Sequence, residues 1–263
     1  MKEAVVVSAV RTAVGKAPRG ILKDTRPDDI GALLVKEAVA RVPGLKVEEI
    51  DDIVIGCAFP ESDQGLNLAR ILAMRAGFPY TVPGQTVNRF CTSGLQAIAT
   101  AAYEIMVGAQ DVMVAGGVEF MSKVPIMGLT PSPNPYLAEH NPQVYTSMGL
   151  TAENVADKFG ITREDQDRFA LSSHQKAAKA IKEGKFKEEV LPVLAKVKEV
   201  QEDGTIKIKE VLFDTEEGVR YDASYEGMAA LKPVFKAKGT VTAGNSSQTS
   251  DGVAALVLMS REK

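Results

Sequence analysis

Apolar runs that read as strands alternate with helix-like segments along the first 119 residues, and this alternation restricts the chain to an α/β fold. Residues 4–9, AVVVSA, lack a polar residue at every second position, which is typical of a strand buried on both faces. Further strands are expected at residues 53–59, 85–89 and 111–115, and helices at 25–42, with Thr25 as the N-cap, 66–76 and 93–107. The pattern predicts a mostly parallel five-stranded sheet with covering helices.

The composition changes after Glu119, and the next segment reads as an insertion into the core. Residues 120–148 are rich in proline and methionine, and a long excursion of this kind is usually functional. Helices are expected at 151–159, 163–183 and 225–235, a hairpin at 195–200 and 205–211, and returning strands at 239–245 and 253–260. The predicted domains are a core of residues 1–119 and 239–263 and an inserted loop domain of residues 120–238.

Charge and composition exclude several classes of protein. The formal net charge of −3 gives no reason to expect nucleic acid or an anionic membrane as a partner. Two cysteines and two histidines form no disulfide framework, and their spacing fits no metal site. No apolar stretch reaches transmembrane length, and the N-terminus is too short and polar for a signal peptide. We expect a soluble, cytoplasmic protein without a metal.

The segment VNRFCTSGLQAIATAA, residues 87–102, places Cys91 between a strand and a helix of small residues. The free N–H groups and positive dipole end of such a helix stabilise a thiolate, and Gly94 lets the backbone turn and a substrate approach. This arrangement is used for covalent acyl transfer, and the N–H of Cys91 would serve an oxyanion hole. The alternative is that Cys91 is a buried small hydrophobic residue.

The other reactive residues give weaker signals. Cys57 lies inside an apolar strand, so packing is the favoured interpretation. His174 is expected on a solvated helix face and His140 in the proline-rich excursion. Since the sequence places neither beside Cys91, no general base is assigned from spacing.

Two glycine-containing segments are candidate binding loops. Gly116-Gly117 follows a predicted strand, but the G-x-G-x-x-G pattern of a dinucleotide site is missing. Residues 239–252 surround Asn245 with glycines and hydroxyl residues, which predicts a tight loop with donors for a carbonyl, an amide or a phosphate. A plain strand connection is the alternative.

Six segments together resemble the thiolases, the acetyl-CoA C-acyltransferases. In this sequence they are VVVSAVRTAVGK, VNRFCTSGLQAI, VMVAGGVEFMS, SMGLTAENVA, ITREDQDRFALSSHQKA and GTVTAGNSSQTSDGVAAL. The resemblance implies the N-terminal half of a thiolase-like fold. That fold is a layered αβαβα arrangement of two similar halves, and the first half carries an inserted α/β loop domain that holds coenzyme A.

The resemblance also assigns roles to residues of this chain. Cys91 would attack a thioester carbonyl and carry the acyl group. Six residues would line the coenzyme A site: Met148 at the acyl and pantetheine tunnel, Arg220 near the adenine nucleotide, Phe235 as a wall, and Ala243, Gly244 and Ser247 along the pantetheine. Coenzyme A and acetyl-CoA are then substrates, and no cofactor is tightly bound.

Three positions depart from the family pattern. Gly227 stands where the family has a serine that contacts coenzyme A, and Thr92 is larger than the residue common after the nucleophile. Ser147-Met148-Gly149 replaces the His-Met-Gly of many acetoacetyl-specific members, which favours a broader range of 3-ketoacyl-CoA substrates.

A larger departure is the absence of the C-terminal thiolase domain from the sequence. The family's second cysteine, in a C-x-G loop, its histidine, in a G-H-P loop, and an N-E-A-F segment all belong to that domain, and Cys57 matches none of them. The surface that the two halves share in the family would be uncovered. We therefore expect a homo-oligomer, a dimer or tetramer, or a partner chain that supplies the C-terminal half.

The expected function is acyl transfer in fatty acid metabolism, including β-oxidation. The reaction would be reversible thiolytic cleavage of 3-ketoacyl-CoA, or Claisen condensation of acetyl-CoA, through an acyl-cysteine, with this chain lacking the acid/base residues. One alternative is a non-catalytic module of a split thiolase that binds coenzyme A or another subunit. A second is a nucleotide-dependent oxidoreductase, against which the missing glycine fingerprint argues.

Overall fold

The computed structural model describes residues 1–263, and the chain divides into two compact units. The first unit holds residues 1–129, 187–217 and 249–263, and the second holds residues 130–186 and 218–248. These boundaries differ from the predicted insertion of residues 120–238, because residues 187–217 pack with the core and residues 239–248 do not.

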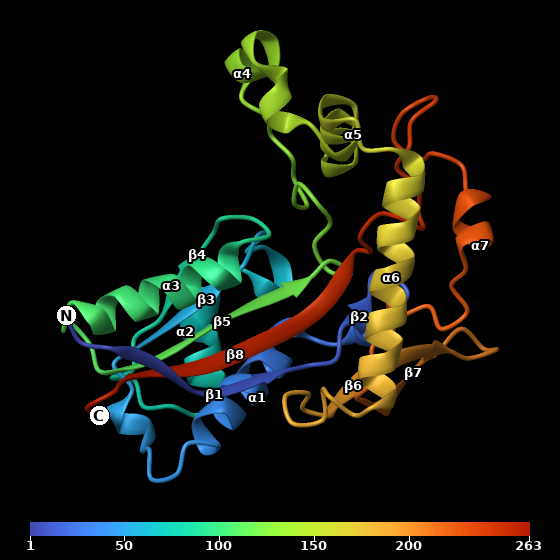
Figure 1. The fold of residues 1–263 in the computed structure, drawn as a ribbon. Coiled ribbons are helices and arrows are strands. Elements are labelled where there is room, and N and C mark those ends of the chain that lie inside the picture. The colour runs from blue at the N-terminus through green and yellow to red at the C-terminus, as the bar shows by residue number, and fades with distance from the viewer. The chain divides into compact units, whose positions relative to one another are not determined.

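A six-stranded sheet organises the first unit (Figure 1). Its strands follow the order β1-β8-β5-β3-β4, and the short β2 pairs with β8. The strands are β1 Ala4–Arg11, β2 Gly15–Lys16, β3 Asp52–Gly56, β4 Gln85–Val87, β5 Val112–Phe120 and β8 Ser250–Ser260. β3 pairs in parallel with β4 and β5, whereas β8 is antiparallel to β1, β2 and β5.

The prediction of a mostly parallel five-stranded sheet is wrong for β8. The chain leaves the sheet at the end of β5 and returns beside it, since Asp251 pairs with Phe120. A strand that re-enters at the end where its neighbour stops must run back along that neighbour in the opposite direction. β8 therefore separates β1 from β5 and makes the sheet mixed.

Helices cover both faces of this sheet. α1, Pro27–Ala40, and α2, Leu68–Arg75, share one core with the strands, and α3, Ser93–Met106, packs on the opposite face (Figure 1). Successive residues of a strand point to opposite faces, so Ile53 belongs to the core of α1 and α2 and Val54 to the core under α3. The small side chains of Ala97 and Ala101 bring α3 close to the sheet.

A hairpin of β6, Val193–Val200, and β7, Ile206–Phe213, is fixed to the segment before α1. Thr25 donates its hydroxyl to the carbonyl of Lys196 at 3.3 Å and accepts the N–H of the same residue at 2.9 Å. Thr25 is therefore not the predicted N-cap of α1. Arg26 takes that place without a side-chain cap, and Pro27 is the first helical residue.

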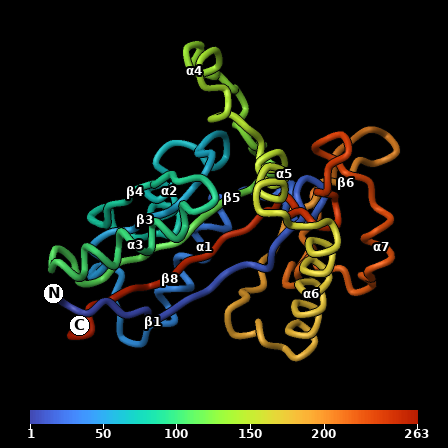
Figure 2. Tube along the Cα trace, turned by 45° about the horizontal axis from the view of Figure 1, so that its top comes forward, coloured from blue at the N-terminus to red at the C-terminus, as the bar shows by residue number.

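Three 3₁₀ turns and the chain ends complete the first unit. The turns are η1 Ile21–Asp24, η2 Val47–Glu49 and η3 Ser62–Gln64. The two chain ends lie side by side at one end of the sheet (Figure 2), where Arg261 forms an ion pair with Glu3 at 2.5 Å.

Helices and loops make up the second unit. The helices are α4 Pro135–His140, η4 Pro142–Tyr145, α5 Met148–Phe159, α6 Arg163–Lys182 and α7 Tyr225–Ala229. The capping box predicted at the start of α6 is confirmed, because Thr162 and Asp165 exchange side-chain and backbone hydrogen bonds. α7 ends at Ala229, and a helix that continues to the predicted residue 235 is disfavoured because Pro233 restricts the residue before it to an extended conformation.

Residues 239–245, predicted as a strand, form a loop in the second unit. The N–H groups of Thr240 and Val241 donate to the buried carboxylate of Glu153 in α5, at 2.9 Å in both cases. One side chain therefore satisfies backbone donors that a neighbouring strand would satisfy in a sheet.

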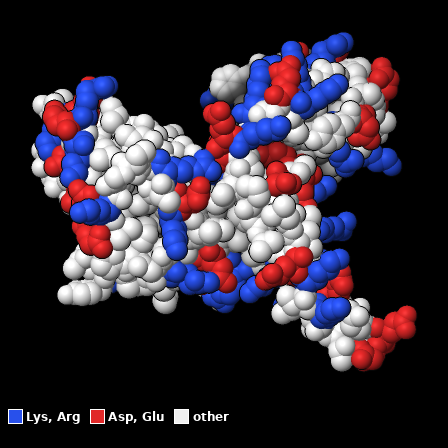
Figure 3. All heavy atoms as spheres, turned by 90° about the horizontal axis from the view of Figure 1, so that it is seen from below, with Lys and Arg blue, Asp and Glu red and all other residues white.

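Charged side chains of both signs are interspersed on the face shown in Figure 3, between broad uncharged stretches. A continuous basic surface, which nucleic-acid binding requires, is not present on this face. None of the helices combines the length and apolar character needed to cross a membrane.

Candidate active site

Cys91 lies at the surface on a tight turn between β4 and α3. The turn closes through Ser93, whose hydroxyl donates to the carbonyl of Phe90 at 2.6 Å and accepts the N–H of Arg89 at 2.8 Å. Phe90 has a φ of +46°, a conformation that costs a non-glycine residue roughly 1–3 kcal/mol. The sharp turn is thus at Phe90 and not at Gly94, and the exposed thiol excludes the alternative of a buried Cys91.

A network of polar side chains, of which Gln64 is buried, connects this turn to the sheet. Asn88 accepts the N–H of Phe90 at 2.9 Å and donates to the carbonyl of Ala58 at 2.8 Å. The N–H of Ala58 donates in turn to Glu119 at 2.6 Å, and Gln64 donates to the same carboxylate at 2.7 Å. Burial raises the pKa of Glu119, and these donors partly oppose the rise.

Glycines let the first turn of α3 rest directly on the strands. A Cβ at Gly56 would lie 2.2 Å from the carbonyl carbon of Ser93, and one at Gly117 would lie 3.4 Å from Cα of Gly94. Gly116 and Gly117 belong to β5 and not to a phosphate loop after it. Backbone therefore packs on backbone here, which fixes where the turn before the helix must lie.

Cys57 is buried, whereas Cys91 is exposed. The side chain of Cys57 is 1% exposed, at the end of β3. Burial, followed by the nearby charge of Glu119, raises the pKa of Cys57 to about 12. The thiol stays protonated at neutral pH, which agrees with the packing role that its sequence position predicts.

In the second unit, the structure brings Phe235 against the start of α5. Met148 is the first residue of this helix and is 64% exposed. A Cβ at the next residue, Gly149, would lie 2.1 Å from the ring of Phe235, so the two segments are in close contact. These neighbouring residues present an apolar surface, although Phe235 lies outside a helix.

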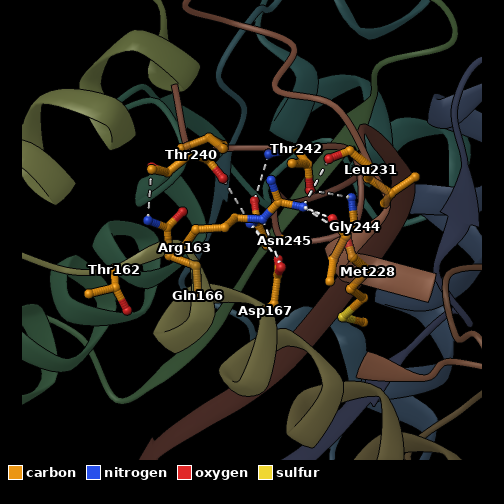
Figure 4. Close-up of polar contacts among 12 residues, drawn as sticks. Thr162, Arg163, Gln166, Asp167, Met228, Leu231, Thr240, Thr242, Gly244 and Asn245 are labelled. Carbon is orange, nitrogen blue, oxygen red and sulfur yellow. Dashed lines mark hydrogen bonds and ion pairs between the residues drawn. The ribbon is translucent and has the colours of Figure 1, made fainter. Parts of the chain in front are cut away.

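Hydrogen bonds of the Asn245 side chain hold the loop that carries Ala243 and Gly244. Asn245 accepts the N–H of Thr242 at 2.7 Å and donates to the carboxylate of Asp167 in α6 at 2.8 Å (Figure 4). Ala243 and Ser247 are exposed on this loop. The tight polar loop predicted around Asn245 is thus present.

Arg220 lies on an exposed segment next to His174 of α6. The backbone N–H of Arg220 donates to Nδ1 of His174 at 3.2 Å. His174 was expected on a solvated face, but it is half-buried and anchors the segment that carries the guanidinium.

Sequence reasoning missed the acids that hold these segments, which are the buried Glu153 and Asp167 and the half-buried Glu119. A signal exists for Glu119, since it is the charged residue in the apolar run VMVAGGVEF. No signal exists for Asp167, because its i,i+4 spacing from Arg163 is also typical of an ordinary surface pair.

Comparison with known proteins places this geometry in a family. A sequence profile described as the thiolase N-terminal domain matches residues 4–262. The chain belongs to the thiolase family. A 3-ketoacyl-CoA thiolase of Bacillus subtilis (strain 168) is 57% identical over 263 residues, covering 100% of this chain and 67% of that protein. The peroxisomal 3-ketoacyl-CoA thiolase 1 of Arabidopsis thaliana is 42% identical over 263 residues, covering 98% of this chain and 58% of that protein.

A solved structure shows that the chain has the thiolase fold. The crystal structure of the Bacillus anthracis acetyl-CoA acetyltransferase matches with a TM-score of 0.84 and 40% identity, covering 100% of this chain and 66% of that one. The chain thus spans between 58% and 67% of the length of these three thiolase relatives.

We predict that the two cysteines of this thiolase chain react differently with iodoacetamide. Cys91 is exposed and should be alkylated in the native protein. Cys57 is buried with a raised pKa, so its thiol should stay protonated and unmodified up to about pH 9. Peptide mass spectrometry should find both residues modified only after denaturation. Native labelling of Cys57 as fast as that of Cys91 would contradict the structure.

Replacement of Gly56 by alanine should weaken the fold of this thiolase chain. The added Cβ overlaps the backbone of Ser93, so Gly56→Ala should lower the free energy of unfolding by about 1–3 kcal/mol. Gly94→Ala is the matched control, because its Cβ meets nothing closer than 3.8 Å and alanine favours a helix. Urea unfolding followed by circular dichroism measures both, and equal losses in the two variants would rule out the close packing.

Proposed function

We propose that this chain provides the acyl-accepting part of a thiolase that acts on 3-ketoacyl-CoA and acetyl-CoA. The observation that carries the proposal is the exposed thiol of Cys91 on a turn held by backbone contacts and by hydrogen bonds of Ser93 and Asn88. Two relatives are named 3-ketoacyl-CoA thiolases, which supports 3-ketoacyl-CoA as the substrate class. Ser147 in place of the histidine of acetoacetyl-specific members favours the same class.

In the proposed reaction, the sulfur of Cys91 attacks the 3-keto carbonyl of the substrate. A carbon–sulfur bond forms, the carbon–carbon bond to the acetyl-CoA fragment breaks, and the carbanion that leaves takes up a proton to become acetyl-CoA. The thiol of a second coenzyme A then attacks the acyl-cysteine, so that acyl-CoA leaves and Cys91 regains its proton. The reverse sequence starts with transfer of an acetyl group from acetyl-CoA to Cys91.

The second unit supplies the residues that we propose for coenzyme A. Met148 and Phe235 would contact the apolar parts of the carrier, since both are substantially exposed. Ala243, Gly244 and Ser247 would lie along the pantetheine arm. The exposed guanidinium of Arg220 would bind the phosphates of the nucleotide. Coenzyme A is a substrate in this scheme, and no tightly bound cofactor takes part.

The proposed reaction also needs an acid and a base, and we assign neither role to a residue near Cys91. Both histidines belong to the second unit, and Cys57 is buried and protonated. We propose that a partner chain or a C-terminal thiolase domain supplies the acid and base within a homo-oligomer or a complex. The large apolar side chains exposed on α3, at its C-cap and on β1 support such an assembly; they are Leu95, Tyr103, Val107 and Val6.

Two free thiols fit a reducing compartment, and we propose the cytoplasm.

Acetyl-CoA should acetylate the chain at Cys91 and nowhere else. Mass spectrometry of the intact protein and of its peptides should find one acetyl group on Cys91, lost in Cys91→Ala and kept in Cys57→Ala. Without an acid and a base, the acetyl group should turn over slowly. Equal acetylation of Cys91→Ala would contradict the proposal, and binding of coenzyme A without acetylation would favour a non-catalytic module.

A further inference from the structure

A buried carboxylate of α6 links two segments of the second unit that lie apart in the sequence (Figure 4). Asp167 is 1% exposed and accepts Nε of Arg163 through one oxygen at 2.7 Å. Its other oxygen accepts Nδ2 of Asn245 at 2.8 Å. A charge that would be costly to bury alone is therefore paired, and its two partners each hold a different stretch of backbone.

The guanidinium of Arg163 holds the end of α7 and the residues after it. One of its terminal nitrogens, Nη2, donates to the carbonyl of Met228 at 2.7 Å and to that of Leu231 at 3.0 Å (Figure 4). Leu231 packs against the loop opposite, since a Cβ at Gly244 would lie 2.6 Å from its Cδ1. Arg163 thereby fixes a side chain that borders the loop apex.

The side chain of Asn245 forms hydrogen bonds with the backbone of its own loop. Its Oδ1 accepts the N–H of Thr242 at 2.7 Å, and its Nδ2 also donates to the carbonyl of Thr240 at 3.1 Å. The hydroxyl of Thr242, which is fully buried, accepts the N–H of Gly244 at 3.1 Å. These hydrogen bonds join the residues on either side of Ala243 to one another, while Ala243 stays exposed at the apex of the loop.

We propose that Arg163, Asp167 and Asn245 are positioning residues that set the spacing between Leu231 and the apex at Ala243. The inference rests on the proposed function, in which this apex lies along the pantetheine arm of coenzyme A. The network itself does not contact the carrier. It keeps the apex ordered before binding, so that less conformational entropy is lost when coenzyme A binds.

The test compares Asn245→Ala with Ser246→Ala in the full chain. Ser246 follows in the same loop and takes part in none of these bonds, so it serves as the matched control. Calorimetry gives the dissociation constant of coenzyme A, and the rate of Cys91 acetylation against acetyl-CoA concentration gives a half-saturating concentration and a limiting rate.

Asn245→Ala should raise the dissociation constant and the half-saturating concentration by about tenfold or more, with the limiting rate unchanged. A general loss of fold would move the limiting rate as well. Ser246→Ala should match the unaltered chain, and labelling of Cys91 by iodoacetamide should proceed at the same rate in both variants.

Arg163→Lys is the second variant, because an ammonium keeps the pairing with Asp167 but lacks the fork that reaches the carbonyls. Arg163→Lys should raise the dissociation constant and the half-saturating concentration as Asn245→Ala does. The inference is wrong if either variant is folded and binds coenzyme A as tightly as the unaltered chain. It is also wrong if both variants fail to fold. An unaltered chain that neither binds coenzyme A nor is acetylated overturns the proposed function as well.

Discussion

The backbone of Gly56 in β3 touches the first turn of α3, and the position of Cys91 depends on that contact. A side chain at residue 56 would overlap Ser93, and Gly117 leaves room for the same turn on β5. With the helix seated so closely, the chain before it turns through a positive φ at Phe90 and leaves Cys91 at the surface. The exposed thiol is thus placed by contacts that its own side chain does not make.

In the second unit, polar side chains rather than a neighbouring strand hold the backbone of the loop at residues 239–245. Glu153 accepts the N–H groups at the start of the loop, and Asn245 closes its stem. Each buried acid is satisfied by several donors, so burial is compatible with its charge. Rigid backbone at the two candidate surfaces therefore comes from a few hydrogen-bonded side chains.

The main helices and strands of the first unit could be predicted because apolar runs are local signals, whereas the strand predicted at residues 239–245 is a loop and α4 was not predicted. Features that depend on long-range contacts could not be predicted. The direction of β8 follows from its pairing with β5, and the position of the hairpin from the bonds between Thr25 and Lys196. Cys91 could be told from Cys57 because small polar residues and the start of a helix follow it, whereas the buried pairing of Asp167 looks like a surface ion pair in the sequence.

We propose that Cys91 accepts acyl groups that coenzyme A delivers. The most direct test compares the acetylation of Cys91 by acetyl-CoA with that by S-acetyl-N-acetylcysteamine, which has the thioester end of the carrier but no nucleotide. Binding of the carrier predicts a rate that saturates with acetyl-CoA and exceeds the rate with the small thioester by about tenfold or more. Equal rates that rise linearly with both thioesters would contradict it.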